Sequence, residues 1–147
     1  MESRTPLQQG SRPKWAIGFL SFLAIFQVIR IFAYSLIQDV LAGKYSEAWL
    51  YPAIVDVFVG VAAIFVSYLL LRRTGLAVWT VGITFFVISI ADHFDAITVI
   101  AHTTAALPSF FSAGKSPAII QLVVMSIIEL LAITLLASKK LRSYYLK

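Results

Sequence analysis

Four long apolar stretches, separated by short polar segments, account for most of the chain. They lie at residues 14–38, 51–71, 76–101 and 117–138. A helix rises 1.5 Å per residue, so roughly 20 apolar residues are enough to cross about 30 Å of hydrocarbon. We therefore predict an all-α integral membrane protein, a four-helix bundle in which residues 1–147 form a single transmembrane domain.

Proline, glycine and serine residues mark the expected ends of these helices. Pro52 suits the first turn of the second helix, because amide groups there have no helical partners in any case. Gly75 follows a basic turn and is expected to stop the second helix. Ser116 and Pro117 are expected to be the N-cap and a first-turn residue of the fourth helix.

The connection before the fourth helix is rich in apolar and aromatic residues. It contains Leu107, Phe110 and Phe111, a composition suited to the headgroup region of a bilayer. We expect these side chains to lie in the outer headgroup layer, as a lid over the mouth of the polar chamber predicted below.

Composition excludes several classes of protein. Hydrophobic residues make up 60% of the chain and charged residues only 13%, whereas soluble domains carry about 25% charge. The absence of cysteine excludes disulfides, thiolate metal sites and thiol chemistry. The net charge is +5, but the basic residues gather at the ends of the apolar stretches and are not interleaved with aromatic residues. We therefore expect the lipid bilayer, and no nucleic acid, as a partner.

The basic residues also predict an orientation. If both termini and the turn after the second helix share one side of the membrane, nine basic residues lie on that side and two, Lys44 and Lys115, lie opposite. The positive-inside rule then places both termini in the cytoplasm, in a plasma or inner membrane. The nine are Arg4, Arg12, Lys14, Arg72, Arg73, Lys139, Lys140, Arg142 and Lys147.

Four of the seven acidic residues fall inside predicted helices, where each ionised group costs on the order of 3 kcal/mol. At 1.5 Å per residue, Arg30, Asp56 and Asp92 all lie roughly 22 to 24 Å above the cytoplasmic boundary. Gln121 reaches the same level, and Glu129 lies about 12 Å deeper. We therefore expect Arg30 to pair with Asp56 or Asp92.

Helical spacing places these groups on inward faces. Gln27, Arg30 and Tyr34 recur at intervals of three and four on the first helix. On the third helix Asp92 and Asp95 share a face with His102 further on, while His93 points about a quarter turn away. The stripes predict a polar chamber in the outer half of the bundle. The candidate ligand- or ion-binding residues are Gln27, Arg30, Tyr34, Asp56, Asp92, Asp95, Gln121 and Glu129.

Charge counting indicates what the chamber binds. One guanidinium cannot neutralise four carboxylates, so protons or a bound cation must balance the rest. The sequence thus favours a site for a proton, a cation or a small polar or cationic ligand, used in transport or ligand binding.

The sequence also permits other interpretations of these polar residues and of the whole chain. The polar groups could serve only to hold the helices together, or the third helix could leave the hydrocarbon near Asp92. The chain could be an accessory subunit of a larger membrane complex, or form a homo-oligomer. It could also be an enzyme in which Asp92 and Glu129 act as acid and base on a lipidic substrate, as in an isomerase.

Metal and cofactor chemistry is not indicated by any motif. Asp92, Asp95 and His102 offer oxygen and imidazole ligands, but their spacing matches no metal-binding motif. There is no Gly-x-Ser-x-Gly turn and no glycine-rich phosphate loop, so the sequence identifies no catalytic residue and no cofactor.

Overall fold

The computed structural model describes residues 13–104 and 106–146, and in this part of the chain it is all-helical. The predicted four-helix membrane bundle is confirmed, because four stretches are long and apolar enough to cross a membrane. They are Lys14–Leu41, Glu47–Arg72, Leu76–His102 and Lys115–Ala137, close to the predicted ranges.

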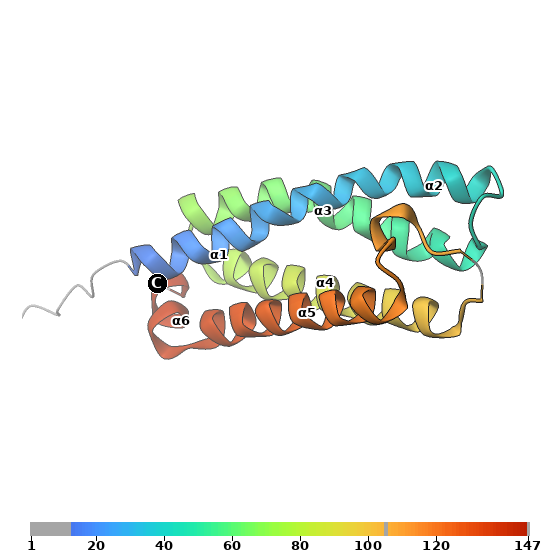
Figure 1. The fold of residues 1–147 in the computed structure, drawn as a ribbon. Helices are drawn as coiled ribbons and strands as arrows, with labels where there is room; N and C mark the ends of the chain where they lie inside the picture. The colour runs from blue at the N-terminus through green and yellow to red at the C-terminus, as the bar shows by residue number, and fades with distance from the viewer. Residues whose placement is uncertain (1–12, 105, 147) are drawn as a thin grey trace, which may run out of the picture.

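The first span is a rod of three joined helices (Figure 1). It consists of α1 (Lys14–Phe26), the 3₁₀ helix η1 (Gln27–Phe32) and α2 (Ala33–Leu41). The second span joins η2 (Glu47–Trp49) to α3 (Leu50–Arg72), and the third is α4 (Leu76–His102). The short η3 (Ser109–Phe111) precedes the fourth span, α5 (Lys115–Ala137), and α6 (Lys139–Tyr145) ends the described chain.

The helix boundaries confirm two expectations and correct two. Pro52 lies in the first turn of α3 and Pro117 in the first turn of α5, as predicted. Gly75 does not stop α3, which ends at Arg72; with φ +124° it is the residue before α4. Ser116 is not the N-cap of α5. Gly114 occupies that position with φ +102°, a left-handed conformation that costs glycine little, so α5 begins before Ser116.

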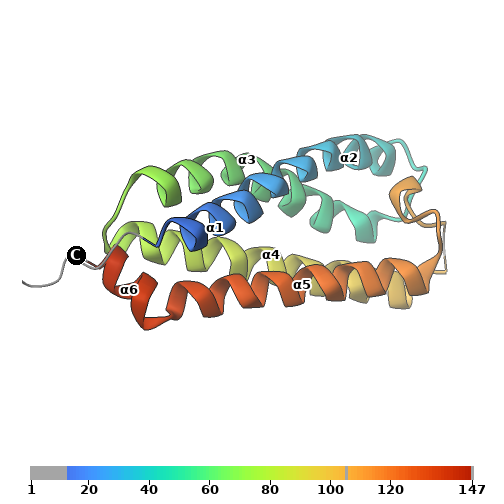
Figure 2. The same cartoon turned by 60° about the vertical axis from the view of Figure 1, so that its left-hand side comes forward.

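The described chain ends lie at the same end of the bundle as the α3–α4 turn (Figures 1 and 2). We call this the terminal end, and the opposite end, with residues 42–46 and 103–114, the loop end. Of the predicted basic side, Lys14, Arg72, Arg73, Lys139, Lys140 and Arg142 lie at the terminal end. Arg4, Arg12 and Lys147 lie outside the described residues. Which side of a membrane this end faces stays a prediction.

The helices pack in the order first span, α3, α4, α5. At the terminal end α1 also packs against α5, which closes the bundle. Toward the loop end the two diverge, and no Cα atom of α2 lies within 8 Å of a Cα atom of α5, both helices being fully described.

The buried apolar residues form two separate cores. The terminal core contains small residues, among them Ala24, Ala63 and Ala132, which let helices approach closely. The loop core is built around Trp49 and Phe111, whose rings are 5.8 Å apart. Between the two cores lies a layer of polar side chains.

Candidate functional site

Arg30 on η1 is the centre of the polar layer. Its guanidinium donates through Nε to Asp56 Oδ1 on α3, and through Nη2 to Asp92 Oδ2 on α4. Through Nη1 it donates to Ser89 Oγ, and to Gln27 Oε1 at 3.4 Å. The expectation that Arg30 pairs with Asp56 or Asp92 is confirmed for both acids.

Glu129 on α5 extends this network to the fourth span, and its side chain is only 1% exposed. Its Oε1 accepts hydrogen bonds from Gln27 Nε2 and Ser89 Oγ, each at 2.6 Å. Its Oε2 lies 3.5 Å from His93 Nδ1, and that nitrogen lies 3.3 Å from Ser126 Oγ. The polar layer therefore consists of Gln27, Arg30, Asp56, Ser89, Asp92, His93, Ser126 and Glu129, and joins all four spans.

The backbone of η1 is held against α3 at a glycine. A Cβ added to Gly60 would lie 2.7 Å from the backbone nitrogen of Ile31 and 3.2 Å from the carbonyl carbon of Arg30. Only glycine therefore leaves room for η1 at this position. This close approach fixes the point from which the Arg30 side chain reaches across the bundle.

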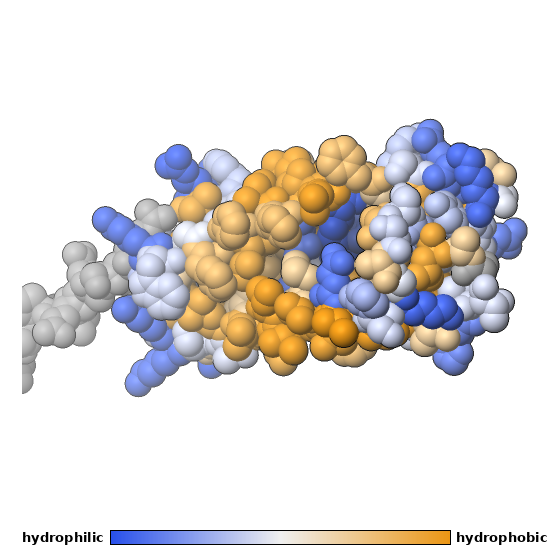
Figure 3. Space-filling model, in the orientation of Figure 1, coloured by the Kyte–Doolittle hydropathy of each residue, from blue (hydrophilic) through white to orange (hydrophobic). Residues whose placement is uncertain are grey.

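A cavity of about 570 Å³ lies beside the polar layer, on its loop side. Arg30, Asp56, Asp92, His93 and Gln121 line it. Figure 3 shows hydrophilic side chains in a hollow that opens within an apolar surface. Five aromatic residues also line the cavity, including the two phenylalanines expected in the lid: Phe26, Phe32, Trp49, Phe110 and Phe111.

The two acids that face the cavity differ in how far they can be reached. The side chain of Asp56 is 26% exposed, whereas that of Asp92 is 2% exposed. Each of the three guanidinium nitrogens of Arg30 already donates to a protein oxygen. By contrast, the buried atoms Asp92 Oδ1 and Glu129 Oε2 accept no hydrogen bond from the described residues. The spare hydrogen-bonding capacity of the acids is therefore that of acceptors.

Three predicted site residues lie neither in the polar layer nor on the cavity wall, and the first of them is Tyr34. Its side chain is 57% exposed and does not line the cavity. The reason is η1: a 3₁₀ helix turns about 120° per residue and an α-helix about 100°. Over the four residues from Arg30, the extra turn carries Tyr34 roughly 100° away instead of about 40°.

Asp95 and His102 are the other two. Asp95 is half-buried and makes no hydrogen bond or ion pair with any described residue, because it lies three residues, roughly 4.5 Å, beyond Asp92 toward the loop end of α4. His102 is exposed at the end of α4. Within residues 13–104 and 106–146, no three His, Asp or Glu side chains gather closely enough to hold a metal ion.

Sequence reasoning missed three members of the layer. His93 was expected to point away from Asp92, and it does, but toward Ser126 and Glu129 on α5. Ser89 and Ser126 each precede a buried acid by three residues, one helical turn. A small polar residue one helical turn from an intramembrane acid was therefore the sequence signal that could have identified both serines.

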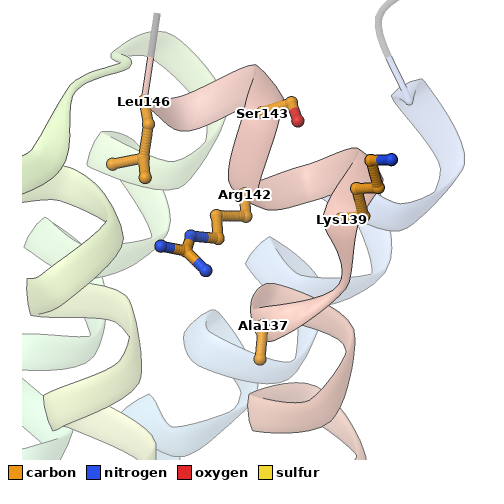
Figure 4. Close-up of a pocket in the computed structure, with 5 residues that line it drawn as sticks. All are labelled: Ala137, Lys139, Arg142, Ser143 and Leu146. Carbon is orange, nitrogen blue, oxygen red and sulfur yellow. The ribbon is translucent and has the colours of Figure 1, made fainter.

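A second cavity, of about 420 Å³, lies at the terminal end (Figure 4). Its lining includes Lys139, Arg142 and Ser143. Figure 4 shows the charged groups of Lys139 and Arg142 pointing to different sides of α6. This cavity therefore lacks the converging polar groups that the first one has.

Comparison of the chain with known protein families, with curated proteins and with solved structures gives no match. The polar layer and the cavity beside it are therefore the features that bear on function.

Proposed function

We propose that this protein binds a small organic cation, such as a protonated amine, in the cavity beside the polar layer. The observation that carries the proposal is that Asp56, Asp92 and five aromatic side chains line the same cavity. Aromatic faces attract cations by about 0.5 to 1 kcal/mol at exposed sites and by about 2 kcal/mol when water is excluded. A volume of about 570 Å³ is in the usual range for small-molecule sites and far exceeds what a bare ion needs.

Charge favours a cation over an anion. Asp56, Asp92 and Glu129 carry two more negative charges than the single guanidinium of Arg30 can balance when all three are ionised. An anion would also find the donors of Arg30 already directed at protein oxygens. A cation near Asp56 supplies part of the missing positive charge.

The proposed role is binding as a step in transport. With both termini in the cytoplasm, as the positive-inside rule predicts, the cavity lies in the outer half of a plasma or inner membrane. Glu129 lies behind the cavity wall and is joined to it through Ser89. Glu129 is a second acidic group beyond the cavity wall, and a path for cations or protons through the membrane requires such groups in succession.

The test is a competition among ligands that differ only in the head group. Purified protein in detergent is incubated with radiolabelled hexylamine and challenged with unlabelled hexylamine, hexanol or hexanoate. We expect hexanol to compete at least tenfold more weakly than hexylamine, and hexanoate more weakly still, because a charged hydrogen bond contributes about 1.5 to 3 kcal/mol. Equal competition by the amine and the alcohol would contradict the proposal.

Asp56→Asn is the informative variant, because it removes the reachable charge and keeps an acceptor for Arg30. We expect it to weaken hexylamine binding by about tenfold or more. The matched control is Asp39→Asn, which removes an acid that pairs with Lys44 away from the cavity. Its binding should equal that of the unmodified protein.

A further inference from the structure

The cavity is closed at both ends of the bundle. Toward the loop end it is covered by Trp49 and Phe111, both buried, with rings 5.8 Å apart. Toward the terminal end it meets the polar layer, and behind that the terminal core, where α1 packs against α5. Neither end offers a wide path to water.

Its side is open. One wall carries Phe32 and Ser35 from η1 and α2, and the facing wall carries Gln121 and Met125 from α5. No Cα atom of α2 approaches one of α5 within 8 Å, in helices described along their whole length. The hollow in Figure 3 lies at the edge of the apolar band and is bordered by hydrophobic residues on its terminal side.

The surface on both sides of the gap is of the kind that faces lipid. Ile29 and Phe32 on the first span are 58% and 78% exposed, and Ile120 and Val124 on α5 are 62% and 48% exposed. A molecule approaching between α2 and α5 therefore comes from the hydrocarbon and not from water.

We propose that the ligand is a membrane-dissolved amphiphile with a cationic head, and that it enters sideways between α2 and α5. The head reaches Asp56 through the gap, and the apolar tail stays between the two helices and in the surrounding lipid. This inference rests on the proposed function, because it assumes that the cavity binds a cation. It adds the route and the ligand class: a long-chain amine rather than a water-soluble one.

The ligand class makes a prediction for tail length. Each added methylene concentrates an amine in the bilayer roughly fourfold. In a laterally open site the longer tail has a place in lipid, so affinity referred to the aqueous concentration rises from hexylamine to tetradecylamine in nanodiscs. In a site closed to lipid, the longer tail has no such place and affinity falls.

The route is tested by bridging the gap. The chain has no cysteine, so Ser35→Cys with Met125→Cys gives a unique pair, one on each wall. The Cα separation exceeds what a disulfide spans, so a bifunctional maleimide is used. Association and dissociation of radiolabelled tetradecylamine are then measured in nanodiscs. The control is the same double variant treated with a monofunctional maleimide, which adds bulk without a bridge.

We expect the bridge to slow both rates at least tenfold relative to the monofunctional control. Unchanged rates with binding intact would overturn lateral access and leave the proposed function standing. Failure of the unbridged protein to bind either amine would overturn the proposed function itself. An affinity that falls with tail length while hexylamine still binds would overturn the ligand class alone.

Discussion

The terminal half and the loop half of the bundle are made from the same four spans, yet the space between the spans is filled in one half and hollow in the other. In the terminal half, Ala24, Ala63 and Ala132 let the helices meet, and α1 closes on α5. In the loop half, α2 and α5 stand apart and a cavity of about 570 Å³ remains. The polar layer lies at the boundary between the two halves.

The difference shows what holds such a bundle together in lipid. Lipid tails are as apolar as leucine, so close packing and hydrogen bonds, not the hydrophobic effect, bring spans together. Small residues supply the packing in the terminal half. At the boundary with the loop half the Arg30 network adds hydrogen bonds between the first span, α3 and α4, and the cavity lies beside this network.

The largest expected effect is a difference between complete labelling and no labelling, and it shows which half of the bundle faces the outside of the cell. Single cysteines at Ser112→Cys, at the loop end, and Thr74→Cys, at the terminal end, are both at exposed positions in a chain without other cysteines. A membrane-impermeant maleimide on intact cells should label the first completely and the second only after permeabilisation. The reverse pattern would place the cavity in the inner half.

The next largest effect is expected at Arg30, where the two halves meet. Arg30→Met leaves Asp56 and Asp92 without their cation and should lower the free energy of unfolding in detergent micelles by about 3 to 5 kcal/mol. Adding Asp56→Asn and Asp92→Asn should recover most of that loss, because no uncompensated charge then remains on these residues.

The control for this series is Arg73→Met, the same change at an exposed position of the terminal end. It should alter the free energy of unfolding little. Strictly additive losses in the combined Arg30 variants would mean that the network does not act as a unit, and that packing connects the loop half as it does the terminal half.

A smaller effect is expected where η1 meets α3. Gly60→Ala should lower the free energy of unfolding by about 1 to 3 kcal/mol, because the new Cβ would lie 2.7 Å from the nitrogen of Ile31. Hexylamine binding should weaken as well, since η1 carries Arg30. Gly18→Ala is the matched control: it lies in α1 with nothing within 4 Å of the added Cβ, and it should be neutral or slightly stabilising. Equal effects of the two changes would show that η1 is not held at Gly60.

The two halves also differ in how much of them could be predicted from the sequence. The spans were found to within a few residues, because a membrane requires each one to be a long apolar helix. Heights along the helices were predicted for Arg30, Asp56 and Asp92, which do meet. A rise of 1.5 Å per residue was sufficient for that. Glu129 was expected about 12 Å deeper, but it shares Ser89 with Arg30 and lies closer to that level than predicted.

Faces and neighbours were harder to predict. Tyr34 was placed with Arg30 on the assumption of α-helical twist, and nothing in its spacing reveals the 3₁₀ segment between them. The opening between α2 and α5 was not predicted either, because the order of apolar residues does not say which spans touch. Only the assembled bundle distinguishes the filled half from the hollow one.

The smallest effect is expected at an ion pair that lies outside both cores. Lys44 Nζ lies 2.6 Å from Asp39 Oδ1 at the loop end, with the lysine side chain 65% exposed. Water and salt screen such a pair, so Lys44→Gln should leave the melting temperature in detergent almost unchanged.

The hydrogen bond from Lys44 to Asp39 raises the pKa of that lysine above 10.5. Any stabilisation is therefore complete below the ordinary lysine pKa and is lost only as pH rises through the higher, folded value. A difference between Lys44→Gln and the unmodified protein should stay constant from about pH 6 to 9 and shrink above that range. If Lys44→Gln destabilised the protein as much as Arg30→Met, an exposed ion pair would contribute as much as the buried Arg30 network. The stabilisation by that network could then not be attributed to its burial.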